Sequence, residues 1–477
     1  MKSKSHWKEL IAVCSVMIVA ILLRMHHVDQ LAVFLSDQAI DSFAVKDILS
    51  GHLTLLGPRA SVGQFFNGPI VYYLMAPFYF VFSSDPIAGT FFQIVLQIMT
   101  IPFLYMLSKR FGDMATGLVS LFLFALSPLL IEYSRATFNS YPAIFFTTVV
   151  LYIISAKSPR TTMVLLAGVL TGMLVQMHYF LYLYAFGYFV FICWQHKSVR
   201  NSLIFLMGGL VGFSPFLIFE ARHGMFNTRA ILFSDFARGG SVGFLKRLGD
   251  IGTAIGSMFG INIATVGVII VILVCLLFIL QKSETRFKRL FISSLLPLLF
   301  CLAIYRGTLQ SHYLIGFMMI FIVVTAFVIA RILSSRSIIL VGIVWISILL
   351  YFQTKLFMIP AAQDEFGLID QRIAAMIISE QRASPESSEL TWNITQDVQR
   401  DNRAMPLRYL LSLDNSLTQP LSVEEYQSNQ ELFVIAPTKK PIDKINTWEV
   451  RAFGTHYKII SNIPVNKTLS VIHLRKD

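Results

Sequence analysis

Runs of mostly apolar residues, many of them about 17–25 residues long, recur along most of this chain. That is the length a helix needs to cross the hydrocarbon core of a bilayer. The composition agrees, because 55% of the 477 residues are hydrophobic and only 14% are charged. A soluble globular chain usually carries about a quarter charged residues. The sequence therefore predicts a mainly α-helical, polytopic membrane protein.

About eleven transmembrane helices are predicted, at residues 7–25, 86–107, 114–131, 141–156, 162–176, 179–195, 201–219, 256–280, 290–305, 313–333 and 337–353. The first has a basic head but no small-residue cleavage site, so we interpret it as an uncleaved span. The apolar segment 68–82 is short and contains Pro69 and Pro77. We interpret it as an interfacial or re-entrant segment.

The positive charges support this topology. With segment 68–82 on the outer surface, the short basic loops all fall on one side, which is typical of the cytoplasm; they contain Lys109/Arg110, Lys157/Arg160, Lys197/Arg200, Lys282/Arg286/Lys288/Arg289 and Arg336. The N-terminus is then cytoplasmic, and we expect a bacterial or archaeal plasma membrane. The net charge of +12 is explained by these loops and by contact with anionic membrane lipid, so no nucleic-acid partner is expected.

Two long loops and the C-terminal region fall on the outer side in this topology. The loops are residues 26–85 and 220–255. Residues 354–477 are more polar, with helical periodicity in "DQRIAAMIISEQRA" and "AMPLRYLLSL" and strand-like runs in "ELFVIAP", "YKIISNIPV" and "TLSVIHL". The sequence therefore predicts a transmembrane domain over residues 1–353 and a small extracytoplasmic α/β domain over residues 354–477.

The first outer loop contains an acidic helical pattern, "SDQAIDSFAVKDILSG". Ser36 is a candidate N-cap, Gly51 offers a stop, and Asp37 would lie in the first turn, where the helix dipole favours an ionised carboxylate. Asp37 and Asp41 are four residues apart and share a face. The simplest alternative is an amphipathic helix on the membrane surface with its acids toward water.

Polar and ionisable residues gather at the predicted outer boundary of the spans. Residues of this kind near apolar spans are often functional. The candidates are Asn67, Arg135, Asn139, His178, Tyr179, Arg222, His223, Arg229 and His312. The alternatives are a membrane-interface role for the aromatic residues and histidines, snorkelling for Arg135, and a lipid anchor at Arg222/His223.

The order of these motifs resembles that of the GT-C glycosyltransferases of the protein O-mannosyltransferase and aminoarabinose transferase type. An acid followed by Gln38 opens the first outer loop, "NGP" with aromatic neighbours precedes the second span, and "SRATFNSYP" lies in a second outer loop. The resemblance covers roughly residues 10–330. This sequence departs from some relatives by having Asn139 in place of an acid, and Asn67–Gly68 in place of a lysine-containing turn.

The resemblance implies an inverting transferase that moves a sugar from a polyprenyl-phosphate donor to an extracytoplasmic lipid, glycan or protein. It implies that Asp37 is the base that deprotonates the acceptor. The leaving phosphate needs cationic partners, for which Arg222, His223 and Arg229 are candidates, with Arg135 and His312 behind them. The remaining substrate-binding candidates are Asp41, Asn67, Asn139, His178 and Tyr179.

Two other classes of protein fit the many spans. A lipid or polysaccharide transporter or flippase would place its polar groups near mid-membrane, whereas here they lie at one boundary. A non-catalytic membrane scaffold would not require Asp37. No cofactor is indicated, and a divalent metal is left open because no ligand cluster of convincing spacing appears, although Asp41 could supply a second acid beside Asp37.

Overall fold

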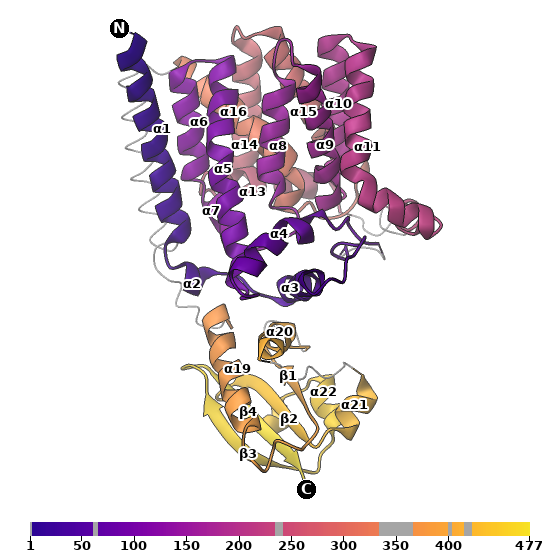
Figure 1. Cartoon of the computed structure of the whole chain (residues 1–477). Coiled ribbons are helices and arrows are strands. Elements are labelled where there is room, and N and C mark those ends of the chain that lie inside the picture. The colour runs from indigo at the N-terminus through magenta and orange to yellow at the C-terminus, as the bar shows by residue number, and fades with distance from the viewer. Residues whose placement is uncertain (1, 61–64, 234–241, 333–365, 399–402, 415–421) are drawn as a thin grey trace. The chain divides into compact units, whose positions relative to one another are not determined.

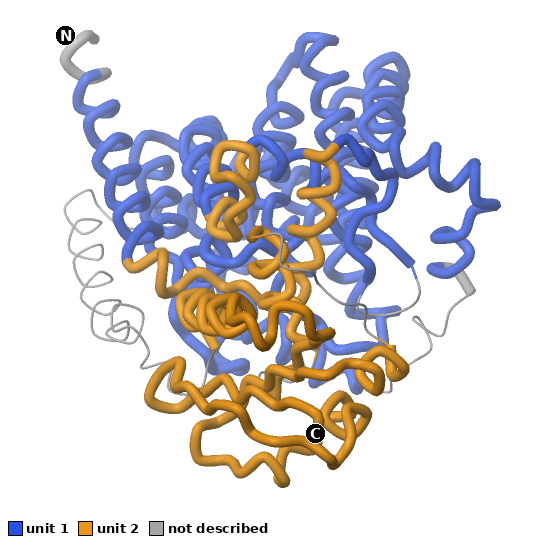
Figure 2. Tube along the Cα trace, turned by 60° about the horizontal axis from the view of Figure 1, so that its bottom comes forward, with its two compact units in different colours: residues 1–26, 51–77, 91–354 blue, residues 27–50, 78–90, 355–477 orange. Residues whose placement is uncertain are grey.

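The computed structural model describes residues 2–60, 65–233, 242–332, 366–398, 403–414 and 422–477. The chain forms two compact units (Figure 2). Unit 1 contains residues 1–26, 51–77 and 91–354, and unit 2 contains residues 27–50, 78–90 and 355–477. The predicted span 337–353 and the predicted domain boundary after residue 353 lie outside the described residues.

Unit 1 is helical, and many of its helices lie side by side (Figure 1). Its elements are α1 (Lys2–Met25), α4 (Ile70–Val81, which ends in unit 2), α5 (Ile87–Phe111, which begins in unit 2), α6 (Met114–Ala125), α7 (Pro128–Arg135), α8 (Ala143–Ile154), α9 (Thr161–Met177), α10 (Leu181–His196), α11 (Val199–Arg222), α12 (Phe226–Phe233), α13 (Phe244–Met258), α14 (Ala264–Leu280), α15 (Thr285–Ile304), η1 (Ser311–Leu314) and α16 (Ile315–Ile332).

The core of unit 1 surrounds α16. Every residue from Ile315 to Val328 is buried, and the helix packs against α6, α8, α14 and α15. A helix that is apolar all round is stable only when neighbours cover every face. Gly316 permits one such close approach, because a Cβ atom there would lie 2.4 Å from the ring of Tyr184.

By length and composition, four helices in the described part of the chain could cross a membrane. They are α5, α11, α15 and the continuous helix Ser311–Ile332. Helices α6 and α7 meet the same criterion together but bend by 55°. Helix α4 has 12 residues, or about 18 Å, which is shorter than the hydrocarbon core of about 30 Å. The fold is thus mainly helical and membrane-like, while the count of eleven spans stays a prediction.

Two predicted spans have different boundaries in the structure. Residues 114–131 do not form one straight helix, because Ser127 caps a new helix that begins at Pro128, which has no N–H to continue the previous one. The predicted span 256–280 begins later, at Ala264, because α13 ends at Met258 and Gly260 adopts a φ of +76°. Both differences come from local chain breaks within apolar sequence.

Helices α9 and α11 pack through glycines. A Cβ atom on Gly168 or Gly172 would lie 2.2 Å from a backbone oxygen of α11, and one on Gly208 would lie 2.3 Å from the Leu165 oxygen of α9. Glycines spaced four residues apart let two helices approach until their backbones touch, which favours association in a membrane.

Unit 2 combines a small sheet with short helices (Figure 1). Its elements are α2 (Val28–Leu31), α3 (Ser36–Leu49), α19 (Leu368–Arg382), β1 (Trp392–Gln396), α20 (Met405–Leu413), α21 (Val423–Ser428), β2 (Glu431–Pro437), η2 (Ile442–Lys444), α22 (Trp448–Phe453), β3 (Tyr457–Pro464) and β4 (Leu469–Lys476). Helices and strands occur at the five C-terminal stretches for which the sequence predicts them. Strand β1 is an addition that no sequence prediction included.

The sheet has the order β1-β2-β4-β3. Strands β1 and β2 are parallel, whereas β2 pairs with β4 and β4 with β3 in antiparallel fashion. Apolar residues of α19 and α20 pack with one face of the sheet, and those of α21 and α22 pack with the other. The sheet is therefore the centre of a two-sided core.

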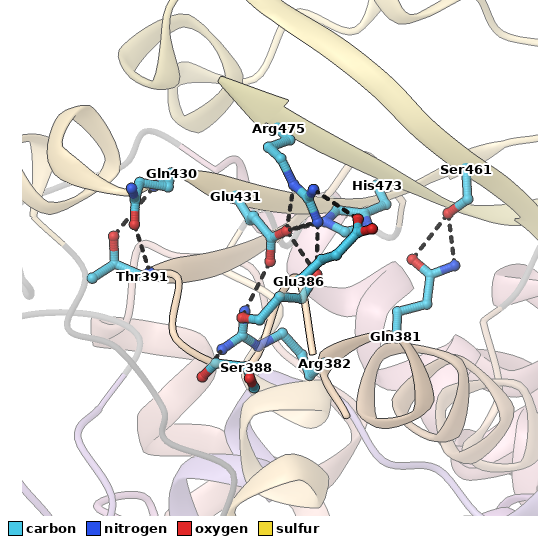
Figure 3. Close-up of polar contacts among 11 residues, drawn as sticks. Gln381, Arg382, Glu386, Ser388, Thr391, Gln430, Glu431, Ser461, His473 and Arg475 are labelled. Atoms are coloured by element: carbon cyan, nitrogen blue, oxygen red, sulfur yellow. Dashed lines mark hydrogen bonds and ion pairs between the residues drawn. The ribbon is translucent and has the colours of Figure 1, made fainter. Parts of the chain in front are cut away.

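A buried carboxylate joins several elements of unit 2 (Figure 3). Glu431 of β2 is fully buried and bonds to Arg382 of α19 at 2.8 Å. It also contacts Arg475 of β4 at 2.8 Å, the hydroxyl of Ser387 at 2.9 Å and His473 of β4 at 3.1 Å. Burial by itself would raise the pKa of Glu431, but these hydrogen bonds and the neighbouring charges lower the pKa to about 2.

Candidate functional site

Most of the candidate residues of unit 1 lie at the ends of its helices or in the segments that connect them. The first segment is a short antiparallel pairing before α4. The N–H of Gly57 donates to the oxygen of Asn67, and the N–H of Asn67 donates to the oxygen of Pro58, both at 2.9 Å. Gly68 then donates to the carbonyl of Gln176, at the end of α9, at 3.0 Å. The "NGP" turn is thus attached to α9 through its backbone.

A Cβ atom on Gly68 would lie 2.4 Å from Oε1 of Gln176. The side chain of Gln176 is buried and donates from Nε2 to the oxygen of Gly212 at 2.6 Å. The residue that follows Asn67 must therefore be small, because Gln176 fills the adjacent space.

The loop after α11 is organised by Glu220. Its buried carboxylate accepts from the N–H of Asn227 at 3.0 Å, from the N–H of Thr228 at 2.8 Å and from Nδ2 of Asn227 at 3.0 Å. The Oδ1 atom of Asn227 accepts the N–H of Phe66 at 2.8 Å. Asn227 thereby connects the stretch from Arg222, at the end of α11, to Arg229, in α12, with the segment of Asn67.

The second predicted outer loop is attached to the same end of α9. The Nδ2 atom of Asn139 donates to the oxygen of Met177 at 2.7 Å. The ring of Phe138 lies edge-on to His312, with 4.9 Å between centroids. Asn139 and the turn at Gly68 therefore bind neighbouring carbonyls, those of Met177 and Gln176.

An aromatic cluster follows α9 and precedes α16. The rings of His178 and His312 have centroids 5.2 Å apart, and His178 stacks on Tyr179 at 4.2 Å. The hydroxyl of Tyr179 donates to that of Tyr313 at 2.9 Å, and Phe180 stacks on Tyr313 at 4.1 Å. Such rings offer flat apolar faces with polar edges, which suit a sugar or the head of a lipid.

The structure therefore brings five predicted residues into one connected region. They are Asn67, Asn139, His178, Tyr179 and His312. The sequence predictions did not include Gln176, Glu220, Asn227 or Tyr313, which connect or extend this region. Tyr313 follows His312 directly, so the "HY" pair repeated at 178–179 and 312–313 was a signal that could have identified it.

Arg222, His223 and Arg229 lie around the loop that Glu220 organises. All three are exposed, and in the described part of the chain neither arginine forms an ion pair with a carboxylate. The imidazole of His223 stacks on Phe219 at 4.1 Å. The two guanidinium groups are thus available to an anion.

Arg135 has a different setting. It is buried at the end of α7, and its Nη2 atom donates to the oxygen of Leu23 at 3.0 Å and to that of His26 at 3.5 Å. These are carbonyl groups at the end of α1, where a cation is favourable. This contact favours a structural role for Arg135.

Asp37 and Asp41 belong to unit 2, on helix α3. The helix begins at Ser36 with Leu35 as its N-cap, so the prediction of Ser36 as the cap is wrong by one residue. The side chain of Gln38 accepts the N–H of Leu35 at 3.0 Å, which removes the need for a serine cap. Asp37 lies in the first turn, as predicted, and is exposed, whereas Asp41 is buried.

Helix α3 ends at Leu49, and Gly51 adopts a φ of +93°, which only glycine tolerates easily. The predicted stop is confirmed. Within the described residues, no group of three His, Cys, Asp or Glu side chains is placed to hold a metal ion.

Comparison with known proteins finds a family match over part of the chain. Residues 67–219 match the sequence model of the family described as dolichyl-phosphate-mannose-protein mannosyltransferase. No curated protein has a significantly matching sequence.

Solved structures with a similar fold cover nearly the whole chain. ArnT from Cupriavidus metallidurans bound to undecaprenyl phosphate has a TM-score of 0.65 and 11% identity, and 97% of each chain is covered. The oligosaccharyltransferase AglB from Archaeoglobus fulgidus, in complex with an inhibitory peptide and a dolichol-phosphate, has a TM-score of 0.51 and 8% identity, with coverage of 94% of this chain and 71% of that one. The arabinofuranosyltransferase AftD from Mycobacteria has a TM-score of 0.52 and 11% identity, with coverage of 98% and 41%.

The match within residues 67–219 contains the "NGP" turn and the "SRATFNSYP" segment, on which the predicted resemblance rests in part, and it also contains the His178–Tyr179 pair. The similarity of fold to ArnT extends beyond this stretch, to 97% of the chain. The chain therefore has a fold similar to that of ArnT, and over residues 67–219 it is similar in sequence to the dolichyl-phosphate-mannose-protein mannosyltransferase family.

Proposed function

We propose that this enzyme transfers a sugar from a polyprenyl-phosphate donor to an extracytoplasmic lipid, glycan or protein. The observation that carries the proposal is the family match, because that family is described by a dolichyl-phosphate sugar donor. The similar ArnT and AglB structures contain undecaprenyl phosphate and dolichol-phosphate, which supports the same class of donor.

The proposed reaction is a single displacement. Asp37 accepts the proton of an acceptor hydroxyl while the hydroxyl oxygen attacks the anomeric carbon of the sugar. A new bond forms between acceptor and sugar, and the bond between the anomeric carbon and the phosphate oxygen breaks. The polyprenyl phosphate leaves with the electron pair, and the anomeric configuration inverts.

Asp37 suits the role of base for two reasons. It is exposed in the first turn of α3, and the N-terminus of a helix stabilises an ionised carboxylate. Asp41 follows one turn later on the same face, and we propose it as a contact for the acceptor or the sugar.

Arg222 and Arg229 are the proposed partners of the donor phosphate. Negative charge grows on the leaving phosphate, and exposed guanidinium groups without a carboxylate partner in the described part of the chain can stabilise it. His223 and His312 are proposed to assist them. Asn67, Asn139, His178 and Tyr179 are proposed to line the sugar site.

The proposal is tested in membranes supplied with labelled polyprenyl-phosphate sugar and extracted acceptors. We expect Asp37→Asn to lower turnover at least about 100-fold, since a general base contributes 10²–10⁴-fold. Asp47→Asn is the matched control, because Asp47 is exposed on the same helix. Transfer by Asp37→Asn at the wild-type rate would refute the base, and a wild type without transfer would refute the donor class.

The stereochemistry is checked separately. The anomeric configuration of the product, measured by NMR, should be opposite to that of the donor. Retention would contradict a single displacement.

A further inference from the structure

Helix α3, which carries Asp37, is anchored to a helix more than 350 residues later in the chain. The Nζ atom of Lys46 donates to the carbonyl of Ser412 at 2.7 Å and lies 3.2 Å from its hydroxyl. Ser412 lies in the last turn of α20. A lysine at that position stabilises the negative end of the helix dipole and satisfies a carbonyl that has no partner within the helix.

Aromatic rings reinforce this attachment. Tyr409 of α20 is fully buried and meets Phe43 of α3 edge-on, with 5.1 Å between centroids. It also meets Phe34, which precedes α3, edge-on at 5.7 Å. Edge-to-face pairs at these distances are favourable beyond the area that they bury.

The same C-terminal helices hold the turn before α5. The hydroxyl of Tyr409 donates to the oxygen of Ser84 at 2.6 Å. Arg372 of α19 contacts both carboxylate oxygens of Asp85, at 2.6 and 2.8 Å. Ser83 and Ser84 both have positive φ, a conformation that costs free energy and therefore needs such external support.

A second contact fixes α3 from the side of α4. The hydroxyls of Ser42 and Tyr79 are 2.6 Å apart. Because Ser42 donates its single proton to the oxygen of Gln38 at 2.7 Å, the hydroxyl of Tyr79 is the donor to Ser42. Helix α3 is thus held along its length by residues of α4 and α20 within unit 2.

The anchored face of α3 is opposite to its acidic face. Lys46 is nine residues after Asp37, and nine residues correspond to about two and a half turns at 3.6 residues per turn. Asp41 is four residues after Asp37, so the two residues lie on nearly the same side of the helix. Lys46 therefore contacts α20 from the side of α3 opposite to the exposed Asp37.

We propose that the C-terminal domain of residues 366–477 positions helix α3, and hence the base, through Lys46, Tyr409 and Arg372. This inference rests on the proposed function of Asp37. The three residues act as positioning residues. A base held by a rigid helix lowers the barrier only while it stays within hydrogen-bonding reach of the acceptor, and small displacements of reacting groups are costly.

The central test compares Lys46→Met with Lys46→Arg in the full-length enzyme. Lys46→Met removes the donor to α20 and should lower kcat about tenfold, with the KM for the polyprenyl-phosphate sugar unchanged. Lys46→Arg keeps a cationic donor and should restore most of the rate. Lys440→Met is the matched control, because Lys440 also forms a polar contact in the same domain, but with Asp397.

A milder variant guards against misfolding. Tyr409→Phe keeps the ring contacts with Phe34 and Phe43 but loses the hydrogen bond to Ser84, so it should fold normally and lower kcat to a smaller extent. Amide hydrogen exchange provides a readout other than activity. In Lys46→Met the amides of residues 36–49 should exchange faster, while those of β2 and β4 stay at the wild-type rate.

The outcomes separate this inference from the proposed function. If Asp37→Asn abolishes transfer but Lys46→Met and Tyr409→Phe match the wild type in kcat and in exchange, the positioning role is refuted and the base remains. If Asp37→Asn is as active as the wild type, the proposed base is refuted, and faster exchange of residues 36–49 in Lys46→Met would still establish the anchor. A loss in Lys46→Met that Lys46→Arg does not restore would also count against positioning.

Discussion

Arg24 and Arg135 cap helices in reciprocal fashion within unit 1. Arg24, near the end of α1, donates to the oxygens of Ala125 at 3.2 Å and Phe124 at 3.4 Å, in the last turn of α6. Arg135 donates to the oxygen of Leu23 at 3.0 Å, in the last turn of α1. Each guanidinium thus satisfies carbonyl groups that a helix end leaves without a partner, so the bend between α6 and α7 is fixed to α1.

The contacts of Arg135 and the exposure of Arg222 predict opposite effects when each arginine is replaced. Arg135→Met should lower the free energy of unfolding by about 1–3 kcal/mol, because buried carbonyl groups lose their hydrogen-bond donor. The KM for the polyprenyl-phosphate sugar should stay nearly unchanged. Arg222→Met should leave stability within about 0.5 kcal/mol, because Arg222 is exposed, and should raise the donor KM. Thermal unfolding in detergent and transfer kinetics measure both. The reverse pattern would make Arg135 the phosphate ligand.

Adjacent glycines of α11 should respond differently to the same substitution. Gly208→Ala places a Cβ atom 2.3 Å from the oxygen of Leu165, and backbone cannot rotate away, so the helices must separate. We expect a loss of about 1–3 kcal/mol. In Gly209→Ala the nearest atom is 3.9 Å away, so stability should stay equal or rise slightly. Equal melting temperatures for the two variants would contradict the close packing of α9 and α11.

The link between Glu220 and the segment of Asn67 depends on one amide. Asn227→Asp removes the donor to Glu220 and puts a second carboxylate beside it in a buried position. We expect a loss of about 3 kcal/mol or more and a higher donor KM, because the stretch from Arg222 to Arg229 loses its anchor. Asn262→Asp makes the same change at an exposed position and should have little effect. Melting and kinetic measurements on both variants test this.

The buried Glu431 should make unit 2 sensitive to acid. Its pKa is lowered to about 2 in the folded protein, below the ordinary value of 4.5. The ionised form therefore stabilises the fold above about pH 4.5, and this contribution is lost progressively as the pH falls from 4.5 toward 2. Hydrogen exchange of β2 and β4 between pH 7 and 3 measures the loss.

The matched variants of this cluster are Glu431→Gln and Glu386→Gln. Glu431→Gln leaves Arg382 and Arg475 without their buried carboxylate, so it should already be destabilised at neutral pH and show a flatter pH profile. Glu386 also contacts Arg475, but its side chain is 83% exposed, so Glu386→Gln should change the stability little. A wild-type pH profile in Glu431→Gln would exclude Glu431 as the acid-sensitive group.

The sequence predicted the features that depend on local physics. The lengths of the apolar runs match the thickness of a bilayer, so the membrane class followed from hydropathy alone. Helix α3 was predicted with its stop at Gly51, and strand β2 was predicted at its observed bounds, because periodicity and turn residues act within a few positions. The "NGP" turn and the His178–Tyr179 pair were recognisable as motifs for the same reason.

Features that depend on distant partners were decided by tertiary structure. Nothing near Lys46 indicates that its ammonium caps α20, since Ser412 is 366 residues away. Similarly, the sequence left Arg135 between a phosphate contact and snorkelling, and only the structure shows its contact with the carbonyl of Leu23. The spacing of Gly168, Gly172, Gly208 and Gly212 suits close packing, but only the structure pairs α9 with α11.

The physical reason for this difference is the distance along the chain over which each interaction acts. Burial in a membrane and helix formation are read from the residues themselves, because each segment satisfies its own backbone hydrogen bonds. A side chain that leaves its helix to bind another element takes its meaning from the position of that element. The sequence by itself therefore determined the class of protein and its main helices, and the tertiary structure decided which residues hold the helix of Asp37 in place.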